Sequence, residues 1–596
     1  MIQAHALVLG TWVIAAAVAM GLGCGMLRVF SISRSGWRQQ ATAFWLGYVA
    51  AIGVLQLWHL AWPIDARAVG LLAALSLLGW WGERPSVGGR RAEWLLALGL
   101  CAWVANRALG PTALFDTGMY HQPAVAWANA WPVVPGLANL HGRLGFNSGA
   151  LLIDAALDLG PLDGLSLHVA NGLLVSVLLV EGVCAARALR GGSTAAYDAF
   201  TVAIAPAVVH AVVRQDVRSL STDAAVALLL LVTIRALVSM LESREHRLGD
   251  LAVVTLLAAG ALVVKLSAAV LAAGLVLVAL AAGRHALRER PLRAAWLALP
   301  ALLLVVGWLV RGVVLSGYPF YPATVAAVDV DWRVPLEQAR AEAAWVTMSA
   351  RNLNTNVIYA GWSWVAPWLR GVVVRGDPFA QLALPMLLLA TLLAIAPRGA
   401  LRSTPWRSTW LALGAGAVFW LAAAPHTRMA QGLAWGALGT MVATLAFVRP
   451  TIRNYLVPGA TALALMLLAK QAVGAAFQAS DARMTAAVDA LVSRPQAGRW
   501  PAPLPTPSLR ATTTVDGLVL SVPTSDNSCW TVLACTPHPS ATLQRRRPGP
   551  TPDASLRWGF QQPAGRWEPE RWPNPWTPFL AWWRCREAGR EDCPIA

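Results

Sequence analysis

The sequence predicts an α-helical polytopic membrane protein with a small β-containing region at its C-terminal end. The 596-residue chain is 57% hydrophobic and only 13% charged, and its mean hydropathy is +0.53. Apolar runs of about 20 residues, the length that crosses a bilayer as a helix, recur along it. After about residue 476 these runs give way to prolines and short alternating segments.

We expect about fourteen of the apolar runs to form transmembrane helices. Several are rich in alanine and glycine, which allow close contact between helices in lipid. The first run has no basic start and no clean cleavage site, so we expect a retained helix and not a signal peptide. The predicted spans lie near residues 5–27, 41–62, 68–82, 93–109, 165–186, 196–213, 222–241, 250–264, 266–283, 294–315, 380–396, 408–424, 429–448 and 455–475.

The spans and the stretches between them divide the chain into six predicted segments. These are 1–109, N-terminal transmembrane helices; 110–164, an outer loop of catalytic type; 165–315, transmembrane helices; 316–378, an outer loop with an interfacial helix; 379–475, transmembrane helices; and 476–596, an extracytoplasmic, disulfide-containing tail.

The placement of arginine predicts the orientation, because cytoplasmic connections are enriched in basic residues. Alternate connections contain Arg28, Arg34, Arg38, Arg84, Arg90, Arg91, Arg187, Arg190, Arg244, Arg247, Arg284, Arg288, Arg290, Arg293, Arg398, Arg402, Arg407, Arg449 and Arg453. The short connections between them contain only Arg67, Arg214, Arg218, Lys265 and Arg428. We therefore expect a protein of the cytoplasmic membrane with both termini outside. Because the +17 net charge is spread between helices and forms no single patch, no nucleic-acid partner is expected.

The cysteines fall into two groups. Cys24, Cys101 and Cys184 lie within apolar runs, where cysteine behaves as a small hydrophobic residue. The other four lie in the tail, and four cysteines in an exported region suit disulfides. We favour Cys529–Cys535 with Cys585–Cys593, although three connectivities are open. A zinc site is disfavoured because the spacings are loose and no CxxC is present.

The two other outer regions contain their own structural signals. Segment 316–378 opens with SGYPFYPATVAAVDVDWRVP and continues into an expected amphipathic helix at Leu336–Ala350. Five tryptophans suggest that this segment lies at the membrane interface, namely Trp332, Trp345, Trp362, Trp364 and Trp368. In the tail, TTTVDGLVLSV and LRWGFQQ predict β-strands. The final RWEPERWPNPWTPFLAWWRC is expected to lack regular structure because it is rich in tryptophan and proline.

The most polar loop of the membrane part is FDTGMYHQPAVAWANAWPVVPGLANLHGRLGFN, residues 115–147. Unpaired polar groups beside lipid are costly, so their density here favours a substrate site over an ordinary solvated loop. The candidate binding residues of this loop are Tyr120, His121, His141, Arg143 and Asn147, with Asp116 as a candidate catalytic acid. Asp158, further along the same segment, is expected to be an exposed acid without a role.

Other candidates lie in short connections on the same side. Asp216 and Asp223 are candidate acids, and Arg214, Arg218, Lys265, His426 and Arg428 are candidate binding residues. A carboxylate near the membrane surface could take a proton from an acceptor hydroxyl, while guanidinium and imidazole groups hold a phosphate leaving group. Alternatively, the arginines and the lysine extend from helix ends toward the interface without a further role.

No soluble catalytic fingerprint is present. The sequence has no Walker A motif, no G-x-G-x-x-G after a strand, no H-E-x-x-H and no G-x-S-x-G. No predicted cytoplasmic loop exceeds about a dozen residues, too few for a nucleotide-binding domain. Chemistry must therefore use groups at the outer face or within the bilayer.

An acidic residue just after a helix, followed by a second acid at the next outer connection, resembles the GT-C class of multi-pass glycosyltransferases. FDTGMYHQPAVAWANAWPVVPGLANLHGRLGFN, SGYPFYPAT, VDWRVP and DNSCWTVLACTP are also similar to a family of uncharacterised bacterial multi-pass membrane proteins. The resemblance implies a GT-C-like core and a polyprenyl-phosphate-linked sugar as donor. Membrane lipids and a glycan or lipid acceptor would be the other partners.

Carried over to this chain, the GT-C resemblance makes Asp116 the candidate base. Either Asp216 or Asp223 would be the second acid, which places the acceptor or a divalent metal ion. Two features depart from the class: Thr117 and Gly118 follow Asp116 where a paired acid is common, and four apolar runs precede it where one is usual.

Two other function classes are open. A transporter of lipid-linked glycans would place ionisable residues in the middle of its helices, where this chain has few acids. Glu181 and Asp198 lie near the ends of their runs. A non-catalytic assembly or glycan-binding protein would use the tryptophan-rich tail, because indole rings stack on sugars and on proteins.

Overall fold

The computed structural model describes most of the chain. The described residues are 2–32, 36–81, 90–112, 114–214, 216–243, 247–351, 361–374, 379–479, 482–494, 501–547, 549, 551–563, 567, 576–590 and 593. Three arginines used to predict the orientation, Arg34, Arg84 and Arg244, lie outside them.

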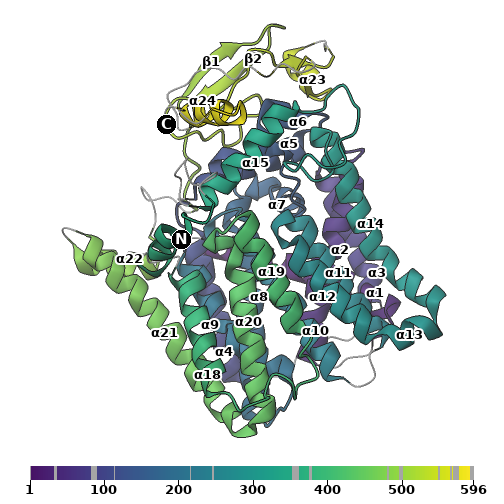
Figure 1. The fold of residues 1–596 in the computed structure, drawn as a ribbon, viewed down its shortest axis with the longest axis vertical. Coiled ribbons are helices and arrows are strands. Elements are labelled where there is room, and N and C mark those ends of the chain that lie inside the picture. The colour runs from purple at the N-terminus through teal and green to yellow at the C-terminus, as the bar shows by residue number, and fades with distance from the viewer. Residues whose placement is uncertain are drawn as a thin grey trace.

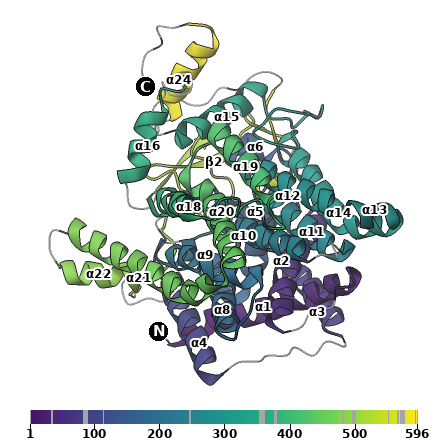
Figure 2. The ribbon, with the colours of Figure 1, turned by 60° about the horizontal axis from the view of Figure 1, so that its bottom comes forward.

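Each of the fourteen predicted apolar runs coincides with a helix. These helices form the bundle that occupies the lower part of Figure 1, and α21 projects from one edge of it in Figures 1 and 2. They are α1 (Ile2–Val29), α2 (Trp37–His59), α3 (Ala66–Trp80), α4 (Arg91–Ala108), α8 (Ala170–Arg190), α9 (Ala196–Val213), α10 (Thr222–Glu242), α11 (Leu248–Val264), α12 (Ala269–Ala282), α14 (Pro291–Ser316), α18 (Leu384–Ile395), α19 (Thr409–Ala423), α20 (Thr427–Val448) and α21 (Arg453–Gln478).

Not all of these helices are long enough to cross a bilayer. Within the described ranges, eight are long and apolar enough, and a ninth results if the bent pair α16 (Val365–Val374) and η8–α18 (Phe379–Ile395) is one span. The helices α3, α11, α12 and α19 are apolar but shorter than the roughly 20 residues that a span needs. The chain is therefore a mostly helical protein of membrane type, but fourteen crossings are not confirmed.

Glycines allow the first three helices to pack backbone against backbone. A Cβ on Gly47 of α2 would lie 1.6 Å from the carbonyl oxygen of Ala19 in α1. On the other side of α1, a Cβ on Gly79 of α3 would lie 1.8 Å from the carbonyl oxygen of Gly21. Larger residues would push these helices apart, as expected for helix contacts in lipid that depend on small residues.

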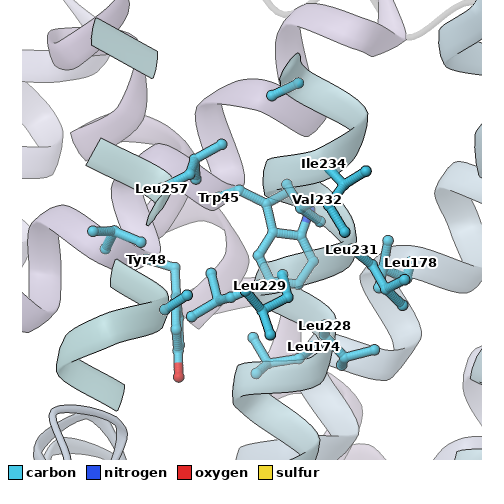
Figure 3. Packing of buried hydrophobic residues seen from close by; sticks show 14 of the residues in the cluster. Trp45, Tyr48, Leu174, Leu178, Leu228, Leu229, Leu231, Val232, Ile234 and Leu257 are labelled. Atoms are coloured by element: carbon cyan, nitrogen blue, oxygen red, sulfur yellow. The ribbon is translucent and has the colours of Figure 1, made fainter. Parts of the chain in front are cut away.

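The centre of the bundle contains an aromatic ring and an ion pair. The indole of Trp45 lies among leucine, valine and isoleucine side chains (Figure 3), and Trp45 has no exposed surface. Its Nε1 donates to Oε1 of Glu181 on α8 at 2.8 Å. The second oxygen of Glu181 accepts from Arg235 on α10, which also donates to Thr201 Oγ1 on α9 at 3.1 Å. This buried network connects α2, α8, α9 and α10.

Short helices and turns join the spans and close both ends of the bundle. At the end that faces the C-terminal region, α5, α6 and α15 lie directly below that region (Figure 1). The short elements are η1 (Thr117–His121, a π-helical turn), α5 (Gln122–Ala130), α6 (Leu137–Leu140), η2 (Gly142–Gly145), α7 (Ala150–Leu157), η3 (Gly160–Leu162), η4 (Ser166–His168), η5 (Asp216–Arg218), η6 (Leu266–Ala268), α13 (Arg284–Glu289), α15 (Leu336–Ala350), η9 (Pro450–Ile452) and α22 (Arg483–Leu491).

The C-terminal region contains two small antiparallel sheets, as the alternating segments predicted. One pairs β1 (Leu509–Thr513) with β2 (Val519–Pro523), and the other pairs β3 (Gln544–Arg545) with β4 (Phe560–Gln561). A short helix, α23 (Pro552–Leu556), precedes β4. Both favoured disulfides, Cys529–Cys535 and Cys585–Cys593, are present.

The prediction of an irregular C-terminal end was wrong where the structure describes it. Trp576–Glu587 forms the helix α24, which packs on α15. Pro578 falls in the first turn, where a helix tolerates proline. Phe579, Trp582 and Trp583 are buried together with Met348 of α15, so tertiary burial stabilises a helix that local composition disfavours.

Candidate functional site

A cavity of about 650 Å³ opens at the end of the bundle that faces the C-terminal region. Its walls come from the turn at Asp116, from the loop at Arg143 and from α10, α14, α15, α19 and α20. Eight predicted site residues line it, namely Asp116, Tyr120, Arg143, Asn147, Asp223, Lys265, His426 and Arg428. The structure thus brings together residues that are up to 312 positions apart in sequence.

Asp116 lies between two guanidinium groups. Its Oδ1 is 3.2 Å from Arg143 Nη1, and its Oδ2 is 3.4 Å from Arg428 Nη2. Burial alone would raise the pKa of the Asp116 carboxyl, but Arg428 and Arg143 outweigh it, and the pKa lies below its ordinary value. Asp116 is therefore ionised in the unliganded site.

A second carboxylate, Asp223, lies in the first turn of α10. Its Oδ1 accepts from Lys265 Nζ at 2.6 Å, and its Oδ2 is 3.9 Å from Nε of Arg428. The N-terminal turn of a helix favours a negative charge, which explains the position of Asp223. Lys265 reaches it because α11 ends at Val264 and Lys265 turns the chain into η6. Arg428 therefore bridges the two acids of the cavity.

Glu342 of α15 is the partner of Arg143 that the sequence did not identify. Arg143 Nε lies 3.3 Å from Glu342 Oε1, and the guanidinium lies over the Tyr120 ring, 5.6 Å from its centroid. Burial raises the pKa of Glu342, although Arg143 acts in the opposite direction. Glu342 is only 5% exposed and lies on the buried side of this helix. In the sequence, the available signal was an acid on the apolar side of the predicted 336–350 helix.

His426 is the N-cap residue of α20. Its Nδ1 accepts from the backbone N–H of Arg428 at 3.2 Å, so a neutral ring has its proton on Nε2. Burial and the positive charge of Arg428 lower the pKa of His426 to about 4. At neutral pH this residue supplies an uncharged N–H donor at the cavity.

The two histidines of the 115–147 loop do not line the cavity. His121 is buried, and neither of its ring nitrogens has a hydrogen-bond partner among the described residues. Burial lowers the pKa of His121 to about 4. His141 accepts from the backbone N–H of Arg143 at 3.2 Å and packs against His538 of the C-terminal region, with ring centroids 6.0 Å apart. His141 thus orients the backbone that presents Arg143.

Of the described residues between the end of α9 and the first turn of α10, only Thr222 and Asp223, both in α10, line the cavity. Arg214 and Asp216 form their own buried ion pair, with Nη2 and Oδ1 3.2 Å apart. Arg218, in the same connection, does not line the cavity. Of the two alternatives for a second acid, Asp223 is therefore the one that lies with Asp116.

Two polar residues of the segment 110–164, Asn147 and Asp158, make hydrogen bonds within the protein. Asn147 lines the cavity, but its Oδ1 accepts from Arg311 Nη1 at 2.5 Å, and its Nδ2 donates to the Trp308 carbonyl at 2.6 Å. Asp158 is not an exposed acid, contrary to expectation. It is 5% exposed and accepts from the backbone N–H of Ser166 at 2.8 Å.

The charged side chains at the cavity are paired with one another. Asp116, Asp223 and Glu342 are each paired with Arg143, Lys265 or Arg428. Across the described ranges, no three histidine, cysteine, aspartate or glutamate side chains gather as metal ligands. An incoming anion would compete with Asp116 for the two guanidinium groups, which can donate to a phosphate and a carboxylate at once.

The remaining wall of the cavity is apolar and aromatic. Phe419, Trp420 and Ala423 of α19 contribute to it, together with Val346 of α15 and Phe115, whose surface is 49% exposed. The lining of the cavity thus combines paired charges with hydrocarbon and ring surface. Such an arrangement suits a ligand with an anionic head and an apolar chain.

Comparison with known proteins gives one family. The model of the family described as Domain of unknown function (DUF8201) matches residues 6–435. No curated protein and no solved structure matches the chain. The matched stretch contains every residue that lines the cavity, from Phe115 to Met429, and ends before the C-terminal region.

Proposed function

The chain belongs to the DUF8201 family, whose matched stretch encloses the cavity, and we propose that it is an integral membrane glycosyltransferase. In this proposal a sugar passes from a polyprenyl-phosphate donor to a cell-envelope acceptor at the outer face of a bacterial cytoplasmic membrane. The observation that supports it most is the position of Asp116 between two arginines, in a cavity lined by both charged and apolar side chains.

Each part of the donor has a suitable wall. The donor phosphate would lie against Arg143 and Arg428, which form strong charge-assisted hydrogen bonds to phosphate oxygens. The first isoprene units would lie against Phe419 and Trp420. The disulfides of the C-terminal region agree with its location outside the cytoplasm.

The same arrangement supplies the base. In the unliganded site the two guanidinium groups lower the pKa of Asp116 and make it a weak base. A bound phosphate draws these groups toward itself and so raises the pKa of Asp116. Asp116 then takes the proton of the acceptor hydroxyl, whose oxygen bonds to the anomeric carbon. The bond from that carbon to the phosphate oxygen breaks, and the phosphate leaves with the electron pair.

Asp223 and Lys265 have a supporting part in this proposal. The Asp223 carboxylate lies near Arg428 Nε and is itself held by the Lys265 ammonium, and either Asp223 or Lys265 can bind sugar hydroxyls. The neutral His426 can donate from Nε2 to the leaving phosphate. If a divalent metal ion takes part, Asp116 and Asp223 are the carboxylates available on this wall.

Replacement of Asp116 by asparagine tests the function. We expect Asp116→Asn to lower formation of the glycan product by about 10²–10⁴-fold, the usual loss on removal of a catalytic base. Thermal stability should change little, because Arg143 keeps Glu342 and Arg428 keeps Asp223 as partners. Product would be measured by mass spectrometry of envelope glycans from cells that express only the variant.

The matched control is Asp163→Asn, because Asp163 is an exposed acid in the segment of residues 110–164. This variant should leave both product and stability unchanged. Full product formation by Asp116→Asn would reject the catalytic role, and a non-catalytic envelope assembly protein would then explain the cavity better.

A further inference from the structure

The C-terminal region contacts the turn that presents Asp116. The carbonyl oxygen of Gly118 accepts two backbone hydrogen bonds, from the N–H groups of Cys529 and Trp530, both at 3.0 Å. Gly118 lies in η1, two residues after Asp116. A loop more than 400 residues later in the sequence is therefore bonded to the backbone of the candidate catalytic turn.

The contact leaves no room for a side chain at position 118. A Cβ on Gly118 would lie 2.8 Å from Ser528 Oγ and 2.8 Å from ring carbons of Trp530. Real Cβ atoms essentially never approach other atoms this closely, so a side chain here would force Ser528 and Trp530 to shift and would disturb the contact. The absence of a side chain at Gly118 is what permits it.

The 526–535 loop has an unusual backbone shape. Asn527 and Trp530 have φ values of 56° and 51°, a region that residues with side chains rarely adopt. Such a conformation persists only where its surroundings enforce it. The Cys529–Cys535 disulfide closes the loop around Trp530, and both cysteines are buried.

The loop is also held by contacts on two sides. On one side, Ser521 of β2 donates to the Ala534 carbonyl at 2.8 Å and accepts from Thr536 N–H at 3.0 Å. On the other side, the buried indole of Trp530 packs with Val125 of α5 and with residues of α7. The disulfide loop therefore links the β-hairpin to the helices that surround Asp116.

We propose that the Cys529–Cys535 loop positions Asp116, so that the site is complete only when the C-terminal region is docked on η1. The effect on glycan formation rests on the function proposed above, but the positional effect does not. Opening the disulfide would release Trp530 from its backbone conformation, and both hydrogen bonds to Gly118 would be lost. The turn would then hold Asp116 less rigidly against Arg143 and Arg428.

Hydrogen–deuterium exchange of the full-length protein tests the positional effect directly. In Cys529→Ala/Cys535→Ala we expect peptides that cover residues 114–125 to exchange at least about tenfold faster than in the wild-type protein. The matched control is Cys585→Ala/Cys593→Ala, which opens the disulfide that joins α24 to the chain end and should leave these peptides unchanged. Product formation should fall by about 10²-fold in the first variant, as for a misplaced catalytic group.

A second variant protects the test against misfolding. Gly118→Ala keeps both disulfides and removes the contact from the opposite side, so it should give the same faster exchange in residues 114–125. Unchanged exchange in either Gly118→Ala or the Cys529/Cys535 variant would overturn the proposal. Faster exchange together with full activity of Asp116→Asn would keep this positional role and reject the glycosyltransferase.

Discussion

At the scale of single residues, the carboxylates near the cavity differ in whether a cation accompanies them. Asp116, Asp223 and Glu342 each lie within 3.4 Å of an arginine or lysine nitrogen. Asp154 of α7 is 7% exposed, and the described part of the chain gives it no hydrogen bond and no ion pair. It lines a water-sized cavity of about 10 Å³ together with Tyr48 and Thr222. Burial, reinforced by Asp158, raises the pKa of Asp154 well above its ordinary value.

The raised pKa predicts how Asp154→Asn changes stability with pH. Below pH about 4 the Asp154 carboxyl is protonated in both the folded and the unfolded chain, so its ionisation does not change the free energy of unfolding. As the pH rises, the unfolded chain ionises first, and the free energy of unfolding of the wild-type protein falls. The variant has no such proton to lose. Its melting temperature relative to wild type should therefore be higher at pH 7 than at pH 4.

Thermal unfolding in detergent at the two pH values measures this difference. Asp163→Asn, which replaces an exposed acid, should show the same difference from wild type at both pH values. If the difference in melting temperature between Asp154→Asn and wild type is the same at pH 4 and pH 7, Asp154 ionises in the folded protein as it does in the unfolded chain.

At the scale of helices, the Glu181–Arg235 pair joins α8 to α10 in the centre of the bundle. Arg235 is 1% and Glu181 is 4% exposed, and Trp45 and Thr201 satisfy further atoms of the pair. An ion pair that is held by hydrogen bonds to two further helices argues for a structural role, because transport requires charges that can exchange partners. Removal of one member would leave a buried charge without its partner.

Replacing one member of the pair should therefore lower the stability of the protein more than replacing both members. We expect Glu181→Leu or Arg235→Leu to destabilise the protein by about 3–5 kcal/mol, while the double variant recovers most of this loss. Melting temperatures of the three variants in detergent measure the effect. The control is Arg67→Ala, which opens an exposed pair with Asp65 and should leave the melting temperature unchanged. A double variant as unstable as the sum of the single variants would contradict this account.

Helices were easier to predict than their lengths or their partners. Apolar runs located fourteen of the helices, because a sustained apolar stretch is visible in the local sequence. They could not distinguish a span from a shorter buried helix such as α12. The helix α24 was missed because its stability comes from α15, about 240 residues away, and not from its own composition. The strands and both disulfides of the tail were confirmed.

At the scale of the whole molecule, the site forms where stretches that are far apart in the sequence meet. The sequence indicated Asp116, Asp223, Lys265 and Arg428, because a charged residue at the end of an apolar run is conspicuous. It could not show that Arg428 bridges Asp116 and Asp223, since that contact depends on how α10 and α20 pack. The ion pair of Glu342 with Arg143 and the contact of the Cys529–Cys535 loop with η1 were missed for the same reason. The C-terminal region contacts the turn that presents Asp116, although the family match ends at residue 435.

The most direct test of the central claim is the binding of polyprenyl phosphate to the purified full-length protein, measured by native mass spectrometry. We expect one bound molecule for wild type and also for Asp116→Asn, which removes the carboxylate that competes with the phosphate for both guanidinium groups. Arg143→Gln/Arg428→Gln should weaken binding by at least about tenfold, since each charge-assisted hydrogen bond contributes roughly 1.5–3 kcal/mol. Equal binding by wild type and the double arginine variant would contradict the claim that this cavity holds a lipid-linked phosphate.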